Sequence, residues 1–269
     1  MTDRRAARCA PIGNRPGRAS TPSDQLSFRL DADRPGSPTA LRPMLPRSVN
    51  EPFDDPDHLF EPWWGGERAL AFVDVDAATG EGSVRLIDRR GRDRAPVLPE
   101  LTGTGGMVGR LGGHAAVLDG SLVVVDASGR PDPAGLAERL AGRSGRTVVY
   151  LAFDLVVLDG RPLLAEPLER RRERLERVVE PGGAFLVVPA IAGEGRALHA
   201  AAAAQGIPAV VGRHRRSPYL PGVRSRLWRL VATSPGDAPP GIPDDAPSAS
   251  TAAVPILALI QRLPLDPGD

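Results

Sequence analysis

The chain has 269 residues, of which 34 are basic and 33 acidic, so its formal net charge is +1 and any nucleic-acid site must be a local patch. A single cysteine, Cys9, excludes an internal disulfide framework and favours a reducing compartment. No run approaches the roughly 18 apolar residues that a membrane span needs, so we expect a soluble, cytoplasmic protein without a membrane partner.

Both ends of the chain differ in composition from its middle. Residues 1–40 mix Arg, Pro, Gly, Ser and Asp with few apolar residues and no periodicity, which predicts a disordered head. Residues 233–269 are rich in Pro and Gly, as linkers are, and form a predicted tail without a following domain. The folded part is therefore expected within residues 41–232.

Short apolar and β-branched runs predict a series of strands. These runs cover residues 67–76, 83–88, 115–126, 146–159, 183–191, 209–213 and 227–232. The first two are separated by a short Gly-containing segment, which predicts a hairpin. Residues 146–159 are almost continuously apolar, which favours a central strand buried on both faces.

Three helices are predicted between the strands. Asp132 and Pro133 precede the first, at residues 135–143, as an N-cap and a first-turn proline. Residues 167–180 are dense in Glu and Arg, and we interpret them as an amphipathic surface helix with a solvated charged face. Residues 194–205 are alanine-rich and end at Gly206, a predicted left-handed cap. Strands in hairpins with covering helices predict an α+β fold.

The most informative stretch is LFEPWWGGERAL at residues 59–70. It resembles the nucleotide-attachment motif of ATP-dependent DNA ligases, which reads FEPKWDGYRAL in the bacterial branch of that family. Trp63 stands where the family has its nucleophilic lysine, and Gly65 where it has the following aspartate. The chain contains no lysine at all, and arginine stays protonated in proteins, so covalent catalysis through a lysine is excluded.

Further motifs extend the resemblance over residues 41–232 in the family's order and spacing. Residues 84–93 resemble its nucleotide-contacting arginine segment, with Arg89 at the arginine. LDGSLVV at 118–124 has Ser121 in place of a glutamate, and AFDL at 152–155 has Phe153 at the adenine-stacking ring. PAVVGR at 208–213 has Arg213 in place of a lysine. RSRLW at 224–228 is followed by Leu230 and Ala232 where two lysines are expected.

The resemblance implies a nucleotidyltransferase (ATP-grasp-like) adenylation domain with two antiparallel sheets and flanking helices. The residues that it places at the cofactor are Glu61, Arg68, Arg89, Phe153 and Arg213. Three positions that carry carboxylates in the family, 65, 121 and 208, are Gly, Ser and Pro here. Because adenylyl transfer needs a nucleophile, Mg²⁺ on carboxylates and cations on the phosphates, we expect no catalytic residue and no Mg²⁺ site. The four histidines show no metal-binding spacing.

The pocket residues leave alternatives open. Trp63 fills the vacated nucleotide site with apolar bulk, or Trp63 and Trp64 stack on bases. Phe153 is a core aromatic side chain or a base platform. Arg68, Arg89 and Arg213 form an anion site, or they are ordinary surface arginines. ATP or AMP therefore remains a candidate ligand.

A run without acidic residues extends between Glu194 and Asp237 and contains a cluster of arginines. It predicts a DNA contact through Arg215, Arg216, Arg224 and Arg226, with a basic face that has no partner as the alternative. Two functions follow: a noncatalytic module that binds DNA or DNA-repair proteins, and an ATP- or AMP-binding regulator. An active ligase with another nucleophile is disfavoured because lysine is absent. The oligomeric state is left open.

Overall fold

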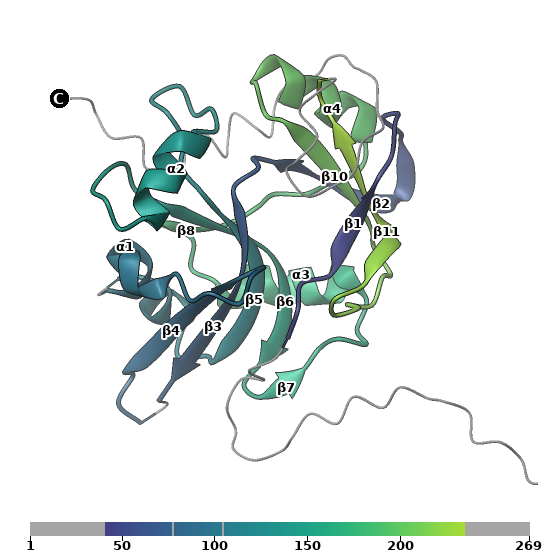
Figure 1. Cartoon of the computed structure of the whole chain (residues 1–269). Coiled ribbons are helices and arrows are strands. Elements are labelled where there is room, and N and C mark those ends of the chain that lie inside the picture. Colours follow the sequence, from purple (N-terminus) through teal and green to yellow (C-terminus); the bar gives the residue numbers. More distant parts are fainter. Residues whose placement is uncertain (1–40, 77, 104, 235–269) are drawn as a thin grey trace, which may run out of the picture. The chain divides into compact units, whose positions relative to one another are not determined.

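The computed structural model describes residues 41–76, 78–103 and 105–234. Two β-sheets form its framework, and helices cover them (Figure 1). The predicted head, residues 1–40, lies outside the described residues, as does nearly all of the predicted tail. The described part contains no helix with the length and apolar character needed to cross a membrane.

The first sheet has five strands in the order β1-β11-β10-β2-β9. Their bounds are β1 Leu45–Ser48, β2 Asp55–Trp63, β9 Ile191–Gly193, β10 Ala209–His214 and β11 Arg224–Ala232. Neighbouring strands are antiparallel except β1 and β11, which run parallel. The resemblance motif thus begins on β2, in the interior of this sheet.

The second sheet has the order β4-β3-β5-β6-β7, and β8 pairs with β6 in parallel. Its strands are β3 Glu67–Val75, β4 Gly82–Asp88, β5 Ala116–Val123, β6 Val149–Leu158, β7 Arg161–Pro162 and β8 Phe185–Val187. Gly65 and Gly66 connect β2 to β3 with φ of 75° and 80°. A Cβ on Gly66 would lie 2.2 Å from the carbonyl oxygen of Leu122, so only glycine fits this turn between the sheets.

Four α-helices and two 3-10 turns, Ala95–Val97 and Val108–Arg110, complete the described part. The α-helices are α1 Pro99–Thr102, α2 Pro133–Leu140, α3 Leu168–Val178 and α4 Gly195–Ala204. Asp132 caps α2, since its carboxylate accepts the backbone N–H of Gly135 at 2.8 Å. Helix α3 packs on β6, and α4 packs on β2 and β10.

The core has two main clusters. One contains side chains from both sheets, among them Phe60, Phe72, Phe153 and Trp228. The other covers the opposite face of the second sheet beneath α1, α2 and α3. As a result β5 is buried along its whole length, and β6 along all but its last residue. The prediction of a strand buried on both faces at 146–159 is confirmed by β6.

The α+β fold with two mostly antiparallel sheets confirms the predicted class, although two strand pairs are parallel. Strands β1, β2 and β7 and the short α1 were not predicted from the sequence. The single strand predicted at 183–191 was wrong, because β8 and β9 belong to different sheets. The interpretation of the α3 charges was wrong in part, because Arg171 and Arg172 are buried at 0% and 3% exposure. Their guanidinium groups are neutralised by Asp154 on β6 of the second sheet and Glu61 on β2 of the first.

Candidate functional site

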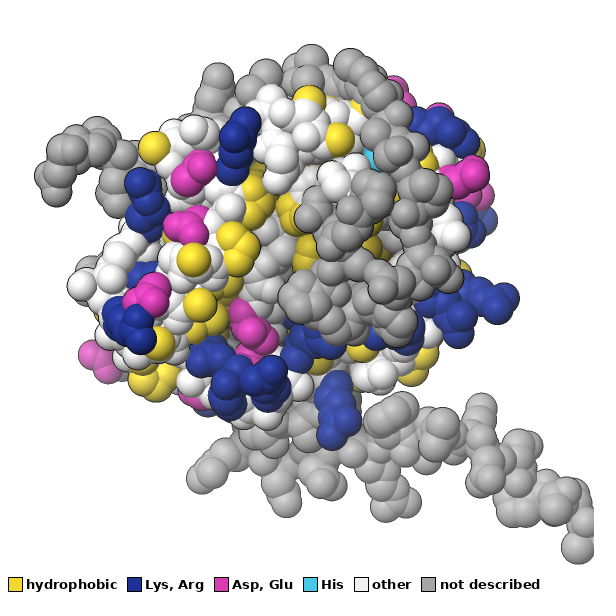
Figure 2. Space-filling view, turned by 45° about the horizontal axis from the view of Figure 1, so that its top comes forward, with side chains coloured by type: hydrophobic (Ala, Val, Ile, Leu, Met, Phe, Trp, Pro, Cys, Tyr) yellow, Lys and Arg dark blue, Asp and Glu magenta, His cyan; other side chains and the backbone are white. Residues whose placement is uncertain are grey.

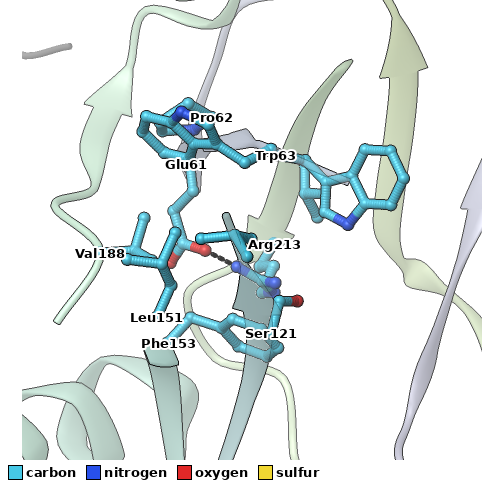
Figure 3. A pocket seen from close by; sticks show the side chains of 11 residues that line it. Glu61, Pro62, Trp63, Ser121, Leu151, Phe153, Val188 and Arg213 are labelled. Carbon is cyan, nitrogen blue, oxygen red and sulfur yellow. Dashed lines mark ion pairs between the residues drawn. The ribbon is translucent and has the colours of Figure 1, made fainter. Parts of the chain in front are cut away.

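A small pocket lies between the two sheets where the resemblance places the nucleotide (Figure 3). Its cavity measures about 20 Å³, which holds one or two water molecules. The residues that line it come from both sheets: Glu61, Pro62, Trp63, Trp64, Ser121, Val123, Leu151, Phe153, Val188, Val211 and Arg213. The pocket therefore brings together three of the five predicted cofactor residues, with the predicted nucleophile position beside them.

Side chains of the chain itself occupy the polar part of this pocket. Figure 3 shows Arg213 of β10 reaching toward Glu61 of β2, with which it forms an ion pair. Arg172 of α3 binds the same carboxylate and donates to the carbonyl oxygens of Phe153 at 2.8 Å and Val188 at 2.6 Å. Burial lowers the pKa of Arg213 to about 9, and Tyr219 acts in the opposite direction. Glu61 is thus shared between two buried arginines.

The ring of Phe153 is covered by guanidinium groups. The guanidinium carbon of Arg213 lies 4.0 Å from the ring centroid, and that of Arg68 lies 4.6 Å from it. Phe153 is 4% exposed. Cations over an aromatic face are attracted by its quadrupole, so these contacts are favourable in the absence of any ligand. Phe153, at the position of the family's adenine-stacking ring, thus makes its ring contacts with arginines of the same chain.

Arg68 is held by a second buried network. It donates Nε and Nη2 to the two carboxylate oxygens of Asp119, both at 2.6 Å, and Nη2 also reaches the carbonyl oxygen of Met44. The Tyr219 hydroxyl donates to Asp119 at 2.5 Å. Burial, with the Asp119 carboxylate, raises the pKa of Tyr219 well above its usual 10, so the phenol keeps its proton. The hydrogen-bonding groups of Arg68 thus point at Asp119 and the Met44 carbonyl.

Trp63 lies at the end of β2, half-buried against a small apolar cluster of Ala209, Val211 and Leu230. Trp63 and Leu230 both stand where the resemblance expects lysines. The position of the nucleophilic lysine and one position of a phosphate-side lysine therefore pack as apolar neighbours. Trp64, in contrast, is 3% exposed and belongs to the core between the sheets.

Arg89 does not line the pocket. It is exposed in the turn after β4, where the buried Asp88 carboxylate accepts the backbone N–H groups of Arg90 and Arg92. Strands β3 and β4 are antiparallel, with Asp88 opposite Ala69. Arg89, the residue after Asp88, therefore lies beside Arg68, the residue before Ala69. Of the five predicted cofactor residues, Arg89 alone is solvated and remains free of the pocket networks.

The four arginines of the predicted DNA contact lie at the opposite end of the first sheet from Trp63. Ala209 pairs with Trp63 and His214 with His58, so Arg215 follows β10 about 20 Å from Trp63. Arg215 forms an ion pair with Glu169 and Arg216 with Asp57, each at 3.2 Å. Arg224 donates to the carbonyl oxygen of Pro46 at 2.8 Å, and Arg226 is exposed. Acidic side chains from distant segments thus neutralise two of the four.

The charged surface is mixed, and Figure 2 shows arginine and acidic side chains interspersed on the face that it presents.

Two features of the pocket and of the surface were not predicted from the sequence. Arg172 holds the pocket carboxylate, and its position between Leu168 and Leu175 at helical spacing was a usable signal. Arg42 and Arg47 lie beside β11 although they precede it by about 180 residues, and no local pattern indicates this.

His58 gives the β2–β10 end of the sheet an expected acid sensitivity. It is 1% exposed, its Nδ1 lies 2.9 Å from Asp55, and its ring meets that of His214 at 5.2 Å between centroids. Burial lowers its pKa below the usual 6.5; Arg229 and His214 act in the same direction, and Asp55 opposes them.

We therefore expect the unfolding free energy to fall as the pH is lowered below about 6.5, because the unfolded chain then binds the proton first. Above about pH 6.5 the stabilisation that depends on a neutral His58 is fully present. Urea titrations at several pH values between about 5 and 7.5 check this. His58→Leu should flatten this part of the profile, and an unchanged slope in the variant would contradict the assignment.

No group of three or more His, Cys, Asp or Glu side chains within the described ranges is placed to bind a metal ion. The expected lack of a Mg²⁺ site stays a prediction. The positions matching the family's carboxylates belong to three elements: Gly65 lies in the β2–β3 turn, Ser121 on β5 and Pro208 before β10. A Cβ on Gly65 would lie 3.9 Å from Cγ of Pro208, so these two positions are neighbours in space.

Comparisons with known proteins agree with this architecture. The chain is 37% identical over 170 residues to the multifunctional non-homologous end joining DNA repair protein LigD of Mycobacterium tuberculosis, covering 63% of this chain and 21% of that protein. It is 27% identical to the SPbeta prophage-derived DNA ligase-like protein LigB of Bacillus subtilis, covering 71% of this chain and 67% of that protein. The chain thus spans about a fifth of the length of LigD.

The structure of mycobacterial DNA ligase D complexed with ATP and MES superposes with a TM-score of 0.60 at 31% identity. The match covers 72% of this chain and 60% of that one. The profile of the family described as "ATP dependent DNA ligase domain" matches residues 43–230, which include both sheets and the pocket. The chain therefore belongs to the ATP-dependent DNA ligase domain family.

Proposed function

We propose that the protein is a noncatalytic DNA ligase-like domain that binds DNA in the cytoplasm and works with DNA-repair proteins. The observation that carries the proposal is the state of the nucleotide position. Arg213 and Arg68 cover the Phe153 ring, and Glu61 is held by two buried arginines. The side chains that would receive a nucleotide are bonded to one another.

The residues present do not fit ATP with Mg²⁺. The pocket has room for only one or two water molecules, and admitting a purine base would require separating Glu61 from Arg213. Trp63 supplies no nucleophile, since an indole ring has no basic nitrogen lone pair to attack phosphorus.

The second reading, an ATP- or AMP-binding regulator, requires a free face of Phe153. A nucleotide would have to displace two guanidinium groups from the ring and break a buried ion pair. Separating that pair would leave the buried Arg213 guanidinium without its carboxylate, which costs free energy, although Glu61 would keep Arg172. This cost would be subtracted from the affinity of any nucleotide, so the structure favours the DNA-binding reading.

Support for DNA as a partner comes from the relatives and from the surface. The M. tuberculosis relative is a non-homologous end joining DNA repair protein, and this chain presents exposed arginines outside the pocket, such as Arg47 and Arg226. Phosphate contacts from arginines supply most nonspecific DNA affinity and make it depend strongly on salt. Such binding needs neither a nucleotide nor a metal ion.

Fluorescence anisotropy of a labelled DNA duplex with the full chain tests this function. We expect saturable binding that weakens steeply with salt and is unchanged by ATP and Mg²⁺. A nicked duplex should bind like an intact one and stay unsealed. No binding at low salt, or an affinity that increases with ATP, would sink the proposal.

A further inference from the structure

Four arginines from two distant segments meet at one edge of the first sheet. Strand β1 is the edge strand and runs parallel to β11, with Leu45 opposite Arg224 and Pro46 opposite Ser225 (Figure 1). The carbonyl oxygen of Arg42 accepts the N–H of Gly222 at 3.2 Å, which joins the segment before β1 to the turn before β11. We call Arg42, Arg47, Arg224, Arg226 and the intervening Val223 the β1/β11 patch.

The backbone of this patch is fixed by hydrogen bonds on both sides. Leu45 donates to the carbonyl oxygen of Val223 at 2.9 Å, and Val49 donates to that of Leu230 at 2.9 Å. The register jumps within this pair, because Pro46 faces Ser225 while Arg47 faces Arg229. The extra residues of β11 form a bulge that contains Arg226, and bulges re-aim side chains at sheet edges.

The charge of the patch is not neutralised by acidic side chains. Within residues 41–76, 78–103 and 105–234, none of its four arginines forms an ion pair with a carboxylate, and Arg42, Arg47 and Arg226 are exposed. The two segments that supply these arginines, residues 41–50 and 195–236, contain no Asp or Glu that could pair with them. Arg215 and Arg216 differ in this respect, since Glu169 and Asp57 bind them.

The chemistry of the patch suits a phosphate backbone better than a protein surface. Val223, 47% exposed, is the only large hydrophobic side chain that is exposed in the described part of the chain. Protein interfaces need a buried apolar centre, which one valine cannot supply. Guanidinium groups make bidentate contacts with phosphate oxygens, and four of them can follow a nucleic-acid backbone without reading its bases.

We propose that the β1/β11 patch is the surface that binds the DNA phosphate backbone, in place of Arg215 and Arg216. This inference rests on the proposed DNA-binding function and names the site that carries it. With four phosphate contacts, the slope of log affinity against log salt is expected near −3.6, from about −0.9 per contact. Binding should not depend on the base sequence.

The test compares two double variants with equal loss of charge in the full chain. Arg47→Gln with Arg226→Gln removes two exposed arginines of the patch, whose side chains hold no structural bond among the described residues. Arg215→Gln with Arg216→Gln removes two neutralised arginines and is the matched control. Arg224 is left in place because it donates to the carbonyl oxygen of Pro46.

We expect the patch variant to weaken duplex binding at every sequence tested and to make the salt slope shallower by about 2. The control variant should change neither quantity appreciably. Equal losses in both variants, or a larger loss in the control, would overturn the assignment while leaving DNA binding itself intact. Failure of the unmodified chain to bind DNA would instead contradict the proposed function.

A second probe separates DNA from an acidic protein. Polyglutamate carries its carboxylates on flexible side chains and lacks the regular, closely spaced row of phosphates of a duplex, so it should compete weakly against the duplex. Competition at equal charge concentration would mean that the patch recognises acidic polymers in general, against the proposal. Thermal unfolding of each variant confirms that the fold is retained.

Discussion

Replacing Arg171 with methionine is expected to lower the free energy of unfolding by about 3 to 5 kcal/mol. Arg171 is fully buried and donates Nε and Nη2 to the two carboxylate oxygens of Asp154, each at 2.8 Å. Its Nη1 donates to the carbonyl oxygen of Ser217 at 3.0 Å. Methionine would leave Asp154 as an uncompensated carboxylate inside β6 and would disconnect α3 from that strand.

The neighbouring Arg170 supplies the matched control. It lies on the same helix, 64% exposed at its side chain, and its partner is the solvated Glu173. Arg170→Met should leave the urea midpoint within experimental error, because exposed ion pairs contribute little. Urea titrations of both variants at neutral pH make the comparison. Similar midpoints for the two would mean that the Arg171 pair is not the link between α3 and β6.

The second large effect separates the two arginines that share Glu61. Arg172→Met should destabilise the fold by about 3 to 5 kcal/mol, because it breaks a buried pair and leaves the carbonyl oxygens of Phe153 and Val188 without their donor. Arg213→Met should change stability by less than about 1 kcal/mol. Glu61 keeps Arg172 in that variant, and the loss of Arg213 removes a buried Nε that has no partner among the described groups.

Denaturant titrations of both variants, with the unmodified chain alongside, check this asymmetry. A loss for Arg213→Met as large as that for Arg172→Met would show that both arginines are needed to hold Glu61. A loss for Arg172→Met below about 1 kcal/mol would mean that Arg213 alone neutralises the carboxylate. In either case the description of the closed pocket would have to be revised.

Much of the framework could be predicted from local sequence. Asp132 and Pro133 indicated the start of α2, and its cap is confirmed. The apolar run at 146–159 indicated β6, and the motif at 59–70 indicated the family. These signals succeed because capping, burial on two faces and a contiguous motif are each set by residues that are neighbours in sequence.

The site was less predictable because its decisive contacts join distant segments. Arg213 meets Glu61 across about 150 residues, and Arg172 meets the same carboxylate from a helix whose charges suggested a solvated face. Burial of an arginine depends on whether a carboxylate arrives from elsewhere, and helix periodicity cannot show this. Likewise the acid-free run after Glu194 gave no warning that Asp57 and Glu169 neutralise Arg216 and Arg215.

The measurement that tests the central claim most directly is incubation of the full chain with α-labelled ATP and Mg²⁺, followed by denaturing electrophoresis. A closed pocket without a lysine predicts that no label stays with the protein, and that neither ATP nor AMP raises its melting temperature. Label that survives denaturation would contradict the account, because it would reveal a nucleophile and an open nucleotide site.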